Sequence, residues 1–129
     1  MPARKLISEK MAEFLSAIAH QNRIRIIEEL QAGEQNVNSL QAILGTSHSV
    51  VSQHLSVLRA NKVVKQRKEG NLVFYQLAQP ELANWLLQGL AYLGGGLQSD
   101  EAIRSAVNEV KTIWSHTPEN PFKDGGKNE

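Results

Sequence analysis

The stretch from Gly45 to Leu77 constrains the fold more than any other part of this chain. It opens with a turn residue and continues with about thirteen residues of helical periodicity. Two short segments rich in valine and aromatic residues follow, 64–68 and 72–77, on either side of a turn at Gly70-Asn71. Such segments around a Gly-Asn pair predict a β-hairpin. We therefore expect a mainly α fold with one small hairpin.

The helical part of this stretch has two different faces. Val51, Leu55 and Leu58 recur at helical spacing and predict a buried face. Ser47 precedes the segment and is a plausible N-cap, because its hydroxyl accepts from free backbone N–H groups. The opposite face is short, polar and uncharged, with Ser49, Gln53, Ser56 and, beside them, Ser52. Such a face suits contact with base edges, where glutamine pairs with adenine; the alternative is an ordinary solvated serine-rich face.

The positive charge is concentrated in the same region. The chain as a whole has a formal net charge of only +1. Within residues 47–76 a single acidic residue, Glu69, stands against the basic residues Arg59, Lys62, Lys65, Arg67 and Lys68. A helix without acidic residues beside basic strands predicts contact with phosphates. We interpret the stretch as the recognition helix and wing of a winged helix-turn-helix.

This interpretation selects the residues that would contact DNA. The recognition helix and the wing together supply Ser47, His48, Ser49, Ser52, Gln53, His54, Ser56, Lys65, Arg67, Lys68 and Asn71. Within this set, Arg67 and Lys68 are predicted to contact phosphates near the minor groove, and Gln53 is predicted to read a base.

The stretch resembles the ArsR/SmtB family of bacterial winged-helix repressors. The resemblance lies in Ser47-x-x-x-Val51-Ser52-Gln53-His54-Leu55-x-Val57-Leu58-Arg59, in the wing Arg67-x-x-Gly70-x-x-x-x-Tyr75-x-Leu77, and upstream in Arg23-Ile24-Arg25-Ile26-Ile27. It covers roughly residues 10–93. The resemblance implies a homodimeric repressor that binds double-stranded DNA at an inverted-repeat operator.

Composition limits the other classes of function. The chain has no cysteine, which excludes disulfides, thiol redox switching and thiolate metal sites on it. No apolar run is long enough to span a membrane, and we expect neither a signal peptide nor a membrane partner. No nucleophile elbow or phosphate loop is present, so we predict no enzyme activity. A cytoplasmic protein is expected.

The rest of the chain predicts further helices. We expect a loose N-terminus at 1–6 and a helix at 7–19. A second helix, capped by Asn22, should bury Ile24, Ile27 and Leu30, point Arg23 and Arg25 outward, and end at Gly33. A short helix should end near Leu44. After the wing, Pro80 should begin another helix, which Gly94-Gly95-Gly96 stops. Ser99 should cap a last helix, and Pro118 should terminate that helix.

Surplus apolar residues on the outer helices predict dimerisation. The surface expected to form the interface comprises Ile7, Met11, Phe14, Leu90, Leu93, Ile103, Val107 and Trp114. We therefore expect a winged helix-turn-helix domain with dimerisation helices at 7–116 and a disordered tail at 117–129.

No cofactor or metal is predicted. In metal-sensing members of the family, the lead-in to the helix-turn-helix carries a Cys-Val-Cys motif, and here Asn36 and Asn38 occupy those positions. Amides are poor ligands for soft ions and are good N-caps. His20, at a helix junction, is interpreted as a packing or capping residue.

Two alternatives stay open: an oxygen and nitrogen metal site across the dimer using His116 and acidic residues such as Glu109, and a winged domain used only for protein contact. The inducer is unknown.

Overall fold

The computed structural model describes residues 1–93 and 101–115 of the chain. The chain forms two units, Met1–Gln79 and Pro80–Glu129. Within the described ranges no helix combines the length and the apolar character needed to cross a membrane. The elements of the first unit are α1 (Pro2–Ile18), α2 (Gln21–Leu30), β1 (Gln35–Asn36), α3 (Val37–Leu44), α4 (His48–Ala60), β2 (Val64–Glu69) and β3 (Leu72–Leu77).

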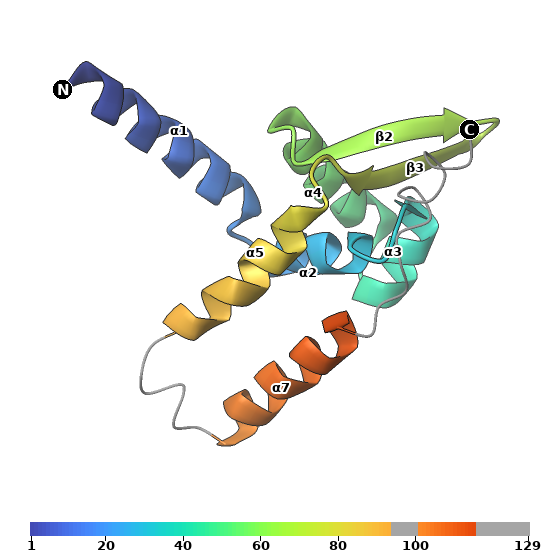
Figure 1. Ribbon diagram of the computed structural model, residues 1–129. Coiled ribbons are helices and arrows are strands. Elements are labelled where there is room, and N and C mark those ends of the chain that lie inside the picture. Colours follow the sequence, from blue (N-terminus) through green and yellow to red (C-terminus); the bar gives the residue numbers. More distant parts are fainter. Residues whose placement is uncertain (94–100, 116–129) are drawn as a thin grey trace, which may run out of the picture. The chain divides into compact units, whose positions relative to one another are not determined.

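The core of the first unit lies among α2, α3, α4 and the sheet (Figure 1). Three helices contribute side chains that are completely removed from solvent: Ile26, Ile27, Leu40, Val51, Leu55 and Leu58. The predicted buried face of the recognition helix is therefore confirmed. Burying such side chains is worth about 1.5–3 kcal/mol each, and this holds α4 at a fixed angle against α2 and α3.

The start of α2 differs from the sequence prediction. His20, not Asn22, is the N-cap, and its Nδ1 accepts from the backbone N–H of Asn22 at 3.0 Å. The capping interpretation of His20 is confirmed. The buried face is Ile26, Ile27 and Leu30, whereas Ile24 is 43% exposed. Both sets of isoleucines fit a helical period, so periodicity alone could not choose the inner face.

Three capping residues define the helix-turn-helix. Asn36 caps α3, because its Oδ1 accepts from Ser39 N–H at 2.8 Å. Gly45 ends α3 in the left-handed conformation, with φ of 66°, which costs glycine little. Ser47 then caps α4 as predicted, accepting from Val50 N–H at 3.2 Å. Gly45 and Ser47 therefore place the turn between α3 and α4.

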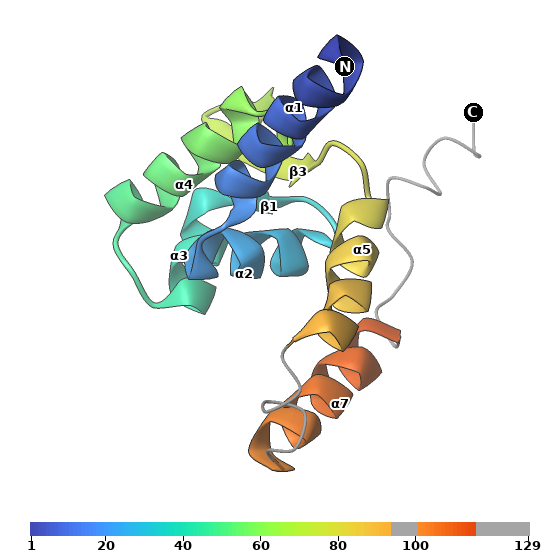
Figure 2. The same ribbon diagram turned by 90° about the vertical axis from the view of Figure 1, so that its left-hand side faces the viewer.

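The wing is part of a three-stranded antiparallel sheet in the order β1-β3-β2. The hairpin occurs where it was predicted, and Gly70 takes a φ of 61° in its turn. The short strand β1, which pairs with Tyr75 and Phe74 of β3, was missed (Figure 2). A strand of two residues is too short to show periodicity, so no sequence pattern predicts it.

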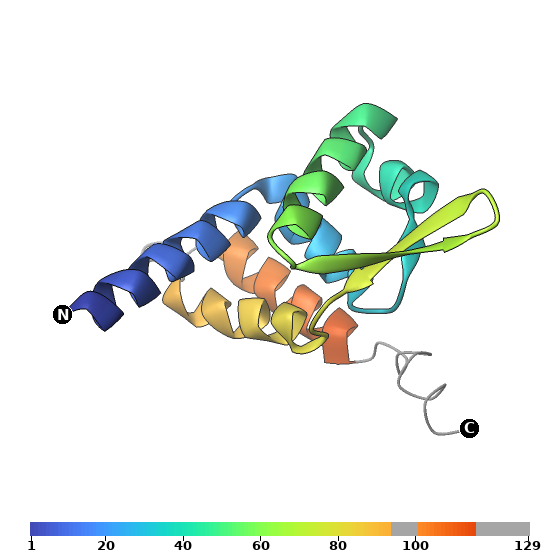
Figure 3. The ribbon, with the colours of Figure 1, turned by 90° about the horizontal axis from the view of Figure 1, so that it is seen from above.

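The first helix begins at Pro2, earlier than predicted. Proline suits the first turn of a helix because its missing N–H has no partner there in any case. Residues 2–6, which were expected to be loose, therefore form the start of α1. Only Ala17 and Ile18, at its C-terminal end, are buried. The helix projects from the rest of the first unit (Figure 3).

The second unit contains α5 (Glu81–Gly89), the 3₁₀ turn η1 (Leu90–Tyr92) and α7 (Glu101–Ser115). The helix predicted after Pro80 is present, with Pro80 as its N-cap residue, and it changes to η1 at Leu90. The predictions for Gly94-Gly95-Gly96, Ser99, Pro118 and the tail 117–129 lie outside the described residues.

Candidate nucleic-acid interface

The outer face of α4 carries the small polar side chains expected of a base-reading surface. Ser49, Gln53 and Ser56 are all exposed, and they lie on the side of the helix opposite its buried residues. His48 is exposed and Ser52 is half-buried; Ser52 Oγ lies 3.5 Å from His48 Nδ1. The helix contains no acidic residue. This face therefore offers neutral donors and acceptors without repelling phosphates.

His54 does not belong to this face. Its side chain is buried, with 9% of the residue exposed, and its Nδ1 accepts from Arg23 Nε at 3.2 Å. Burial lowers the pKa of His54, and the nearby charges of His20 and Arg23 lower it further. The structure therefore removes His54 from the predicted DNA contacts. It also corrects the orientation of Arg23, which points inward and donates a second hydrogen bond to the Ala17 carbonyl oxygen.

The wing presents two lysines to solvent. Lys65 and Lys68 of β2 are exposed, as is Asn71 in the turn. In the described part of the chain, neither lysine belongs to an ion pair. Their charge is therefore available to a phosphate.

Arg67 has a different environment from these lysines. Its guanidinium pairs with both carboxylate oxygens of Glu34: Nε donates to Oε2 at 3.1 Å and Nη2 donates to Oε1. Nη1 donates to Glu69 Oε2 at 2.7 Å. The guanidinium carbon also lies 4.9 Å from the ring centre of Phe74, its register partner on β3. The hydrogen bonds to Glu34 and Glu69 raise the pKa of Arg67 above its usual range.

A second arginine connects the recognition helix to the wing. The Gln66 side-chain amide lies 3.3 Å from Tyr75 Oη and 3.3 and 3.2 Å from the two terminal nitrogens of Arg59. All three groups are satisfied when the amide nitrogen donates to Tyr75 and the amide oxygen accepts from Arg59. Arg59 of α4 is thereby linked through β2 to β3.

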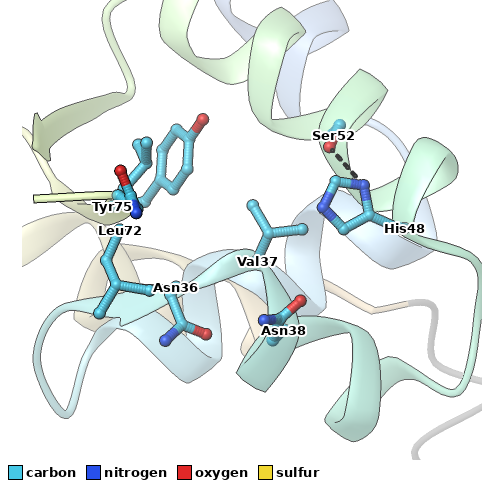
Figure 4. A pocket seen from close by; sticks show the side chains of 9 residues that line it. Asn36, Val37, Asn38, His48, Ser52, Leu72 and Tyr75 are labelled. Carbon is cyan, nitrogen blue, oxygen red and sulfur yellow. Dashed lines mark hydrogen bonds between the residues drawn. The ribbon is translucent and has the colours of Figure 1, made fainter.

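A groove of about 300 Å³ separates the start of α4 from the wing (Figure 4). Its polar walls include Asn38 of α3, His48 and Ser52 of α4, and Asn71 and Tyr75 of the wing. None of the residues that line it is a lysine, an arginine, an aspartate or a glutamate. Because a helix in the major groove and a wing in the minor groove would straddle one DNA strand, this groove suits the sugar-phosphate chain between them.

Of the predicted DNA-contacting residues, the structure brings His48, Ser52 and Asn71 together around one groove, whereas it buries His54. Sequence reasoning missed Glu34, Arg59, Gln66 and Tyr75 as parts of the same region. Glu34 is 33 positions away from Arg67 in the chain, and no local pattern links the two. Among the described residues no group of three or more histidine or acidic side chains is placed to hold a metal ion.

Three of the predicted dimer residues are on the surface. Ile7 and Met11 are 64% and 48% exposed, and Leu93 is 40% exposed. Phe14, Leu90 and Val107 are half-buried. The side chains of Ile103 and Trp114 lie outside the described part of the structure.

Comparison with known proteins shows which family this chain belongs to. The family described as bacterial regulatory protein, arsR family, matches residues 20–66. The transcriptional repressor SmtB homolog of Synechocystis is 39% identical over 77 residues, which is 60% of this chain and 58% of that protein. The transcriptional activator HlyU of Vibrio cholerae is 39% identical over 75 residues, 58% of this chain and 69% of HlyU. The chain belongs to the arsR family.

Solved structures agree with this assignment. Reduced HlyU from Vibrio cholerae matches with a TM-score of 0.63 and 32% identity, over 71% of this chain and 97% of HlyU. The homodimeric winged helix-turn-helix DNA-binding domain Mb0332 from Mycobacterium bovis matches with a TM-score of 0.61 and 26% identity, over 68% of this chain and 83% of that domain. The predicted family and winged fold are confirmed. This arsR chain belongs to a family of DNA-binding transcriptional regulators, not of enzymes.

Proposed function

We propose that this arsR-family chain is a homodimeric transcriptional repressor that binds an inverted-repeat operator and does not sense thiol-binding metals. The observation that carries the proposal is the outer face of α4. Its exposed serines and Gln53 form a neutral hydrogen-bonding surface, and β2 of the same unit carries two exposed lysines. Base contacts would come from the helix and phosphate contacts from the wing.

A second copy of the chain is the proposed partner of α1. Ile7, Met11 and Leu15 follow one another at intervals of four residues and are all exposed. An isolated helix with an exposed apolar stripe is better stabilised against another surface. The homodimeric Mb0332 domain supports two-fold pairing. Leu90, Leu93 and Val107 of the second unit are proposed as further dimer contacts, within a dimerising DNA-binding domain at residues 7–116.

Repression is proposed because a dimer covering one turn of DNA blocks access to a promoter by occupancy. The two similar proteins differ here, since the SmtB homolog is named a repressor and HlyU an activator. A reporter with the operator overlapping its promoter separates the two outcomes. Expression that rises when the gene for this chain is deleted supports repression, and expression that falls supports activation.

Selection of bound duplexes from a random DNA pool tests the DNA-binding proposal. We expect an inverted repeat whose half-sites are about one helical turn, 34–36 Å, apart. A single half-site would argue against the dimer. Retention of no duplex at low salt would instead favour a winged domain used for protein contact. Elemental analysis of protein purified without chelator tests the rival metal sensor that would use His116.

A further inference from the structure

Both arginines of the wing region are bound within the protein. Arg67 of β2 donates to Glu34 and Glu69 and lies on the Phe74 ring. Arg59 of α4 faces the Gln66 amide oxygen. Sequence reasoning counted both arginines as charge available to DNA. Their positions show that both guanidinium groups already make hydrogen bonds that join secondary-structure elements.

The pairing of Arg67 with Glu34 is difficult to exchange for a phosphate. The Glu34 side chain is only 8% exposed, and its two oxygens receive two guanidinium N–H groups. If Arg67 turned toward DNA, it would leave a nearly buried carboxylate without this partner, and an unpaired buried charge is costly. Bidentate arginine-carboxylate pairs are also among the stronger charge-assisted hydrogen bonds. Arg67 is therefore expected to keep its place when DNA binds.

Each arginine holds the wing to a different part of the first unit. Glu34 lies just before β1, so its pairing with Arg67 attaches β2 to the segment that leads into α3. Arg59 lies in the last turn of α4, so its contact with Gln66, and through it with Tyr75, attaches β2 and β3 to the recognition helix. Together they set the angle between the recognition helix and the wing, which determines whether both reach DNA at once.

We infer that Arg59 and Arg67 are positioning residues that fix the wing relative to α4, and that Lys65 and Lys68 supply the wing's contacts to phosphates. The inference rests on the proposed DNA-binding function and revises the predicted phosphate contact of Arg67. A charge held between two carboxylates releases few counterions from DNA, whereas an exposed lysine that neutralises a phosphate releases about one.

The salt dependence of DNA affinity separates the two roles. We would measure binding to the selected operator by fluorescence anisotropy at several salt concentrations. Lys65→Ala and Lys68→Ala should each lower the slope of log affinity against log salt by about 1.8, because the dimer loses one phosphate contact, worth about 0.9, in each protomer. Arg67→Lys should weaken binding several-fold and leave the slope unchanged, because lysine keeps the charge but not the bidentate geometry. Lys10→Ala, an exposed lysine on α1 that pairs with Glu13, is the control and should leave the slope unchanged.

A charge exchange gives the decisive result. Arg67→Glu and Glu34→Arg should each weaken operator binding at least tenfold, and the double variant should recover to within about threefold of the wild type. If Arg67 contacted a phosphate, the double variant would stay weak, because Arg67→Glu would face DNA whatever residue 34 is. A folded double variant, verified by circular dichroism, that does not recover would overturn the inference.

A measurement without DNA keeps this test separate from the proposed function. Amide hydrogen exchange of the free protein should speed up at least tenfold in β2 and β3 of Arg67→Lys, with α2 unchanged. Unchanged exchange in the hairpin would overturn the positioning role even if DNA binding is intact. If the wild type binds no DNA but the hairpin exchange does speed up, the proposed function and the lysine assignment fail while the positioning role stands.

Discussion

Arg23 and His54 connect the second helix directly to the recognition helix. Arg23 Nε donates to His54 Nδ1 at 3.2 Å, and Arg23 Nη1 donates to the Ala17 carbonyl oxygen at 3.0 Å. Because arginine can only donate, Nδ1 must be unprotonated, so His54 is neutral with its proton on Nε2. The His20 ring, which caps α2, lies 4.3 Å from the His54 ring centre. The junction of α1, α2 and α4 thus depends on one uncharged imidazole.

This arrangement predicts that acid destabilises the fold. The pKa of His54 is lowered in the folded state, so the unfolded chain binds the extra proton first. The contribution of His54 to stability is therefore complete above its unfolded pKa of about 6.5 and is lost as pH falls through the lower folded value. Urea unfolding between pH 7.5 and 5.5 should show that the free energy of unfolding decreases as the pH is lowered.

Glutamine at position 54 is the informative variant. His54→Gln keeps an acceptor for Arg23 but cannot take up a proton, so the decline between pH 7.5 and 5.5 should shrink. His48→Gln replaces an exposed histidine and should retain the wild-type decline. If His54→Gln and the wild type lose stability equally over this range, His54 is not the responsible group.

The end of the recognition helix contains a residue in an unfavourable conformation. Lys62 has a φ of 61°, and its N–H donates to the Arg59 carbonyl at 3.0 Å while Val63 N–H donates to the Leu58 carbonyl at 2.8 Å. These two bonds form a Schellman motif, whose left-handed position favours glycine. Lys62→Gly should therefore raise the free energy of unfolding by about 0.5–1 kcal/mol. Lys62→Ala removes the charge but keeps the strained conformation, so it should not raise the free energy of unfolding. Thermal unfolding of both variants measures the difference.

The parts of the fold that could be predicted are those that depend on local sequence patterns. The face of Val51, Leu55 and Leu58, the caps at Ser47 and Asn36 and the hairpin at Gly70 each depend on residues close in the chain. The error within the recognition helix depended on a tertiary partner. His54 fits the polar flank of its helix, and only the position of Arg23 in space shows that it is buried.

The candidate site follows the same rule. The basic character of the wing could be predicted from residue types alone. The sequence does not distinguish the role of a lysine from that of an arginine, because both are cations. Their roles differ once Glu34 is in place, since a nearly buried carboxylate selects the planar guanidinium of Arg67 and leaves Lys65 and Lys68 exposed. Strand β1, which lies between Glu34 and α3, brings this partner close, and its two residues gave no sequence signal.

Gln53 is predicted to read sequence and not only to add affinity. It is exposed at the centre of the neutral face of α4. Gln53→Ala should cost about 1–3 kcal/mol on the selected operator while binding to random duplex stays nearly unchanged. Competition anisotropy with the two duplexes measures both. Equal losses on both would remove Gln53 from the base-reading role.

The proposed dimer makes a prediction about α1. Met11 lies in the exposed stripe between Ile7 and Leu15, so Met11→Glu would place a charge in the interface. Its dimer dissociation constant should rise at least tenfold, about 1.4 kcal/mol, in sedimentation equilibrium. Ser16→Glu adds the same charge to an exposed position on another side of α1 and is the control. A wild type that sediments only as a monomer at micromolar concentration would contradict the dimer itself.

The last prediction concerns regulation by metals. The chain contains no cysteine, and the side chain of Asn36 is already used to cap α3, with its Oδ1 2.8 Å from Ser39 N. An ion can release DNA only if it binds two conformations with different affinity, which requires ligands that suit it. Soft ions select thiolates, which this chain cannot provide.

Zinc, cadmium or arsenite at low micromolar concentration should therefore leave the operator complex intact. Anisotropy titration of the complex with each ion, followed by a chelator, measures this. Release at near-stoichiometric ion that the chelator reverses would contradict the prediction. In that case Glu109→Gln and His116→Gln would be the first variants to examine, because carboxylate and imidazole are the remaining ligand types that bind zinc well. If the complex persists, regulation would have to come from an organic inducer or a partner protein, or repression would be constitutive.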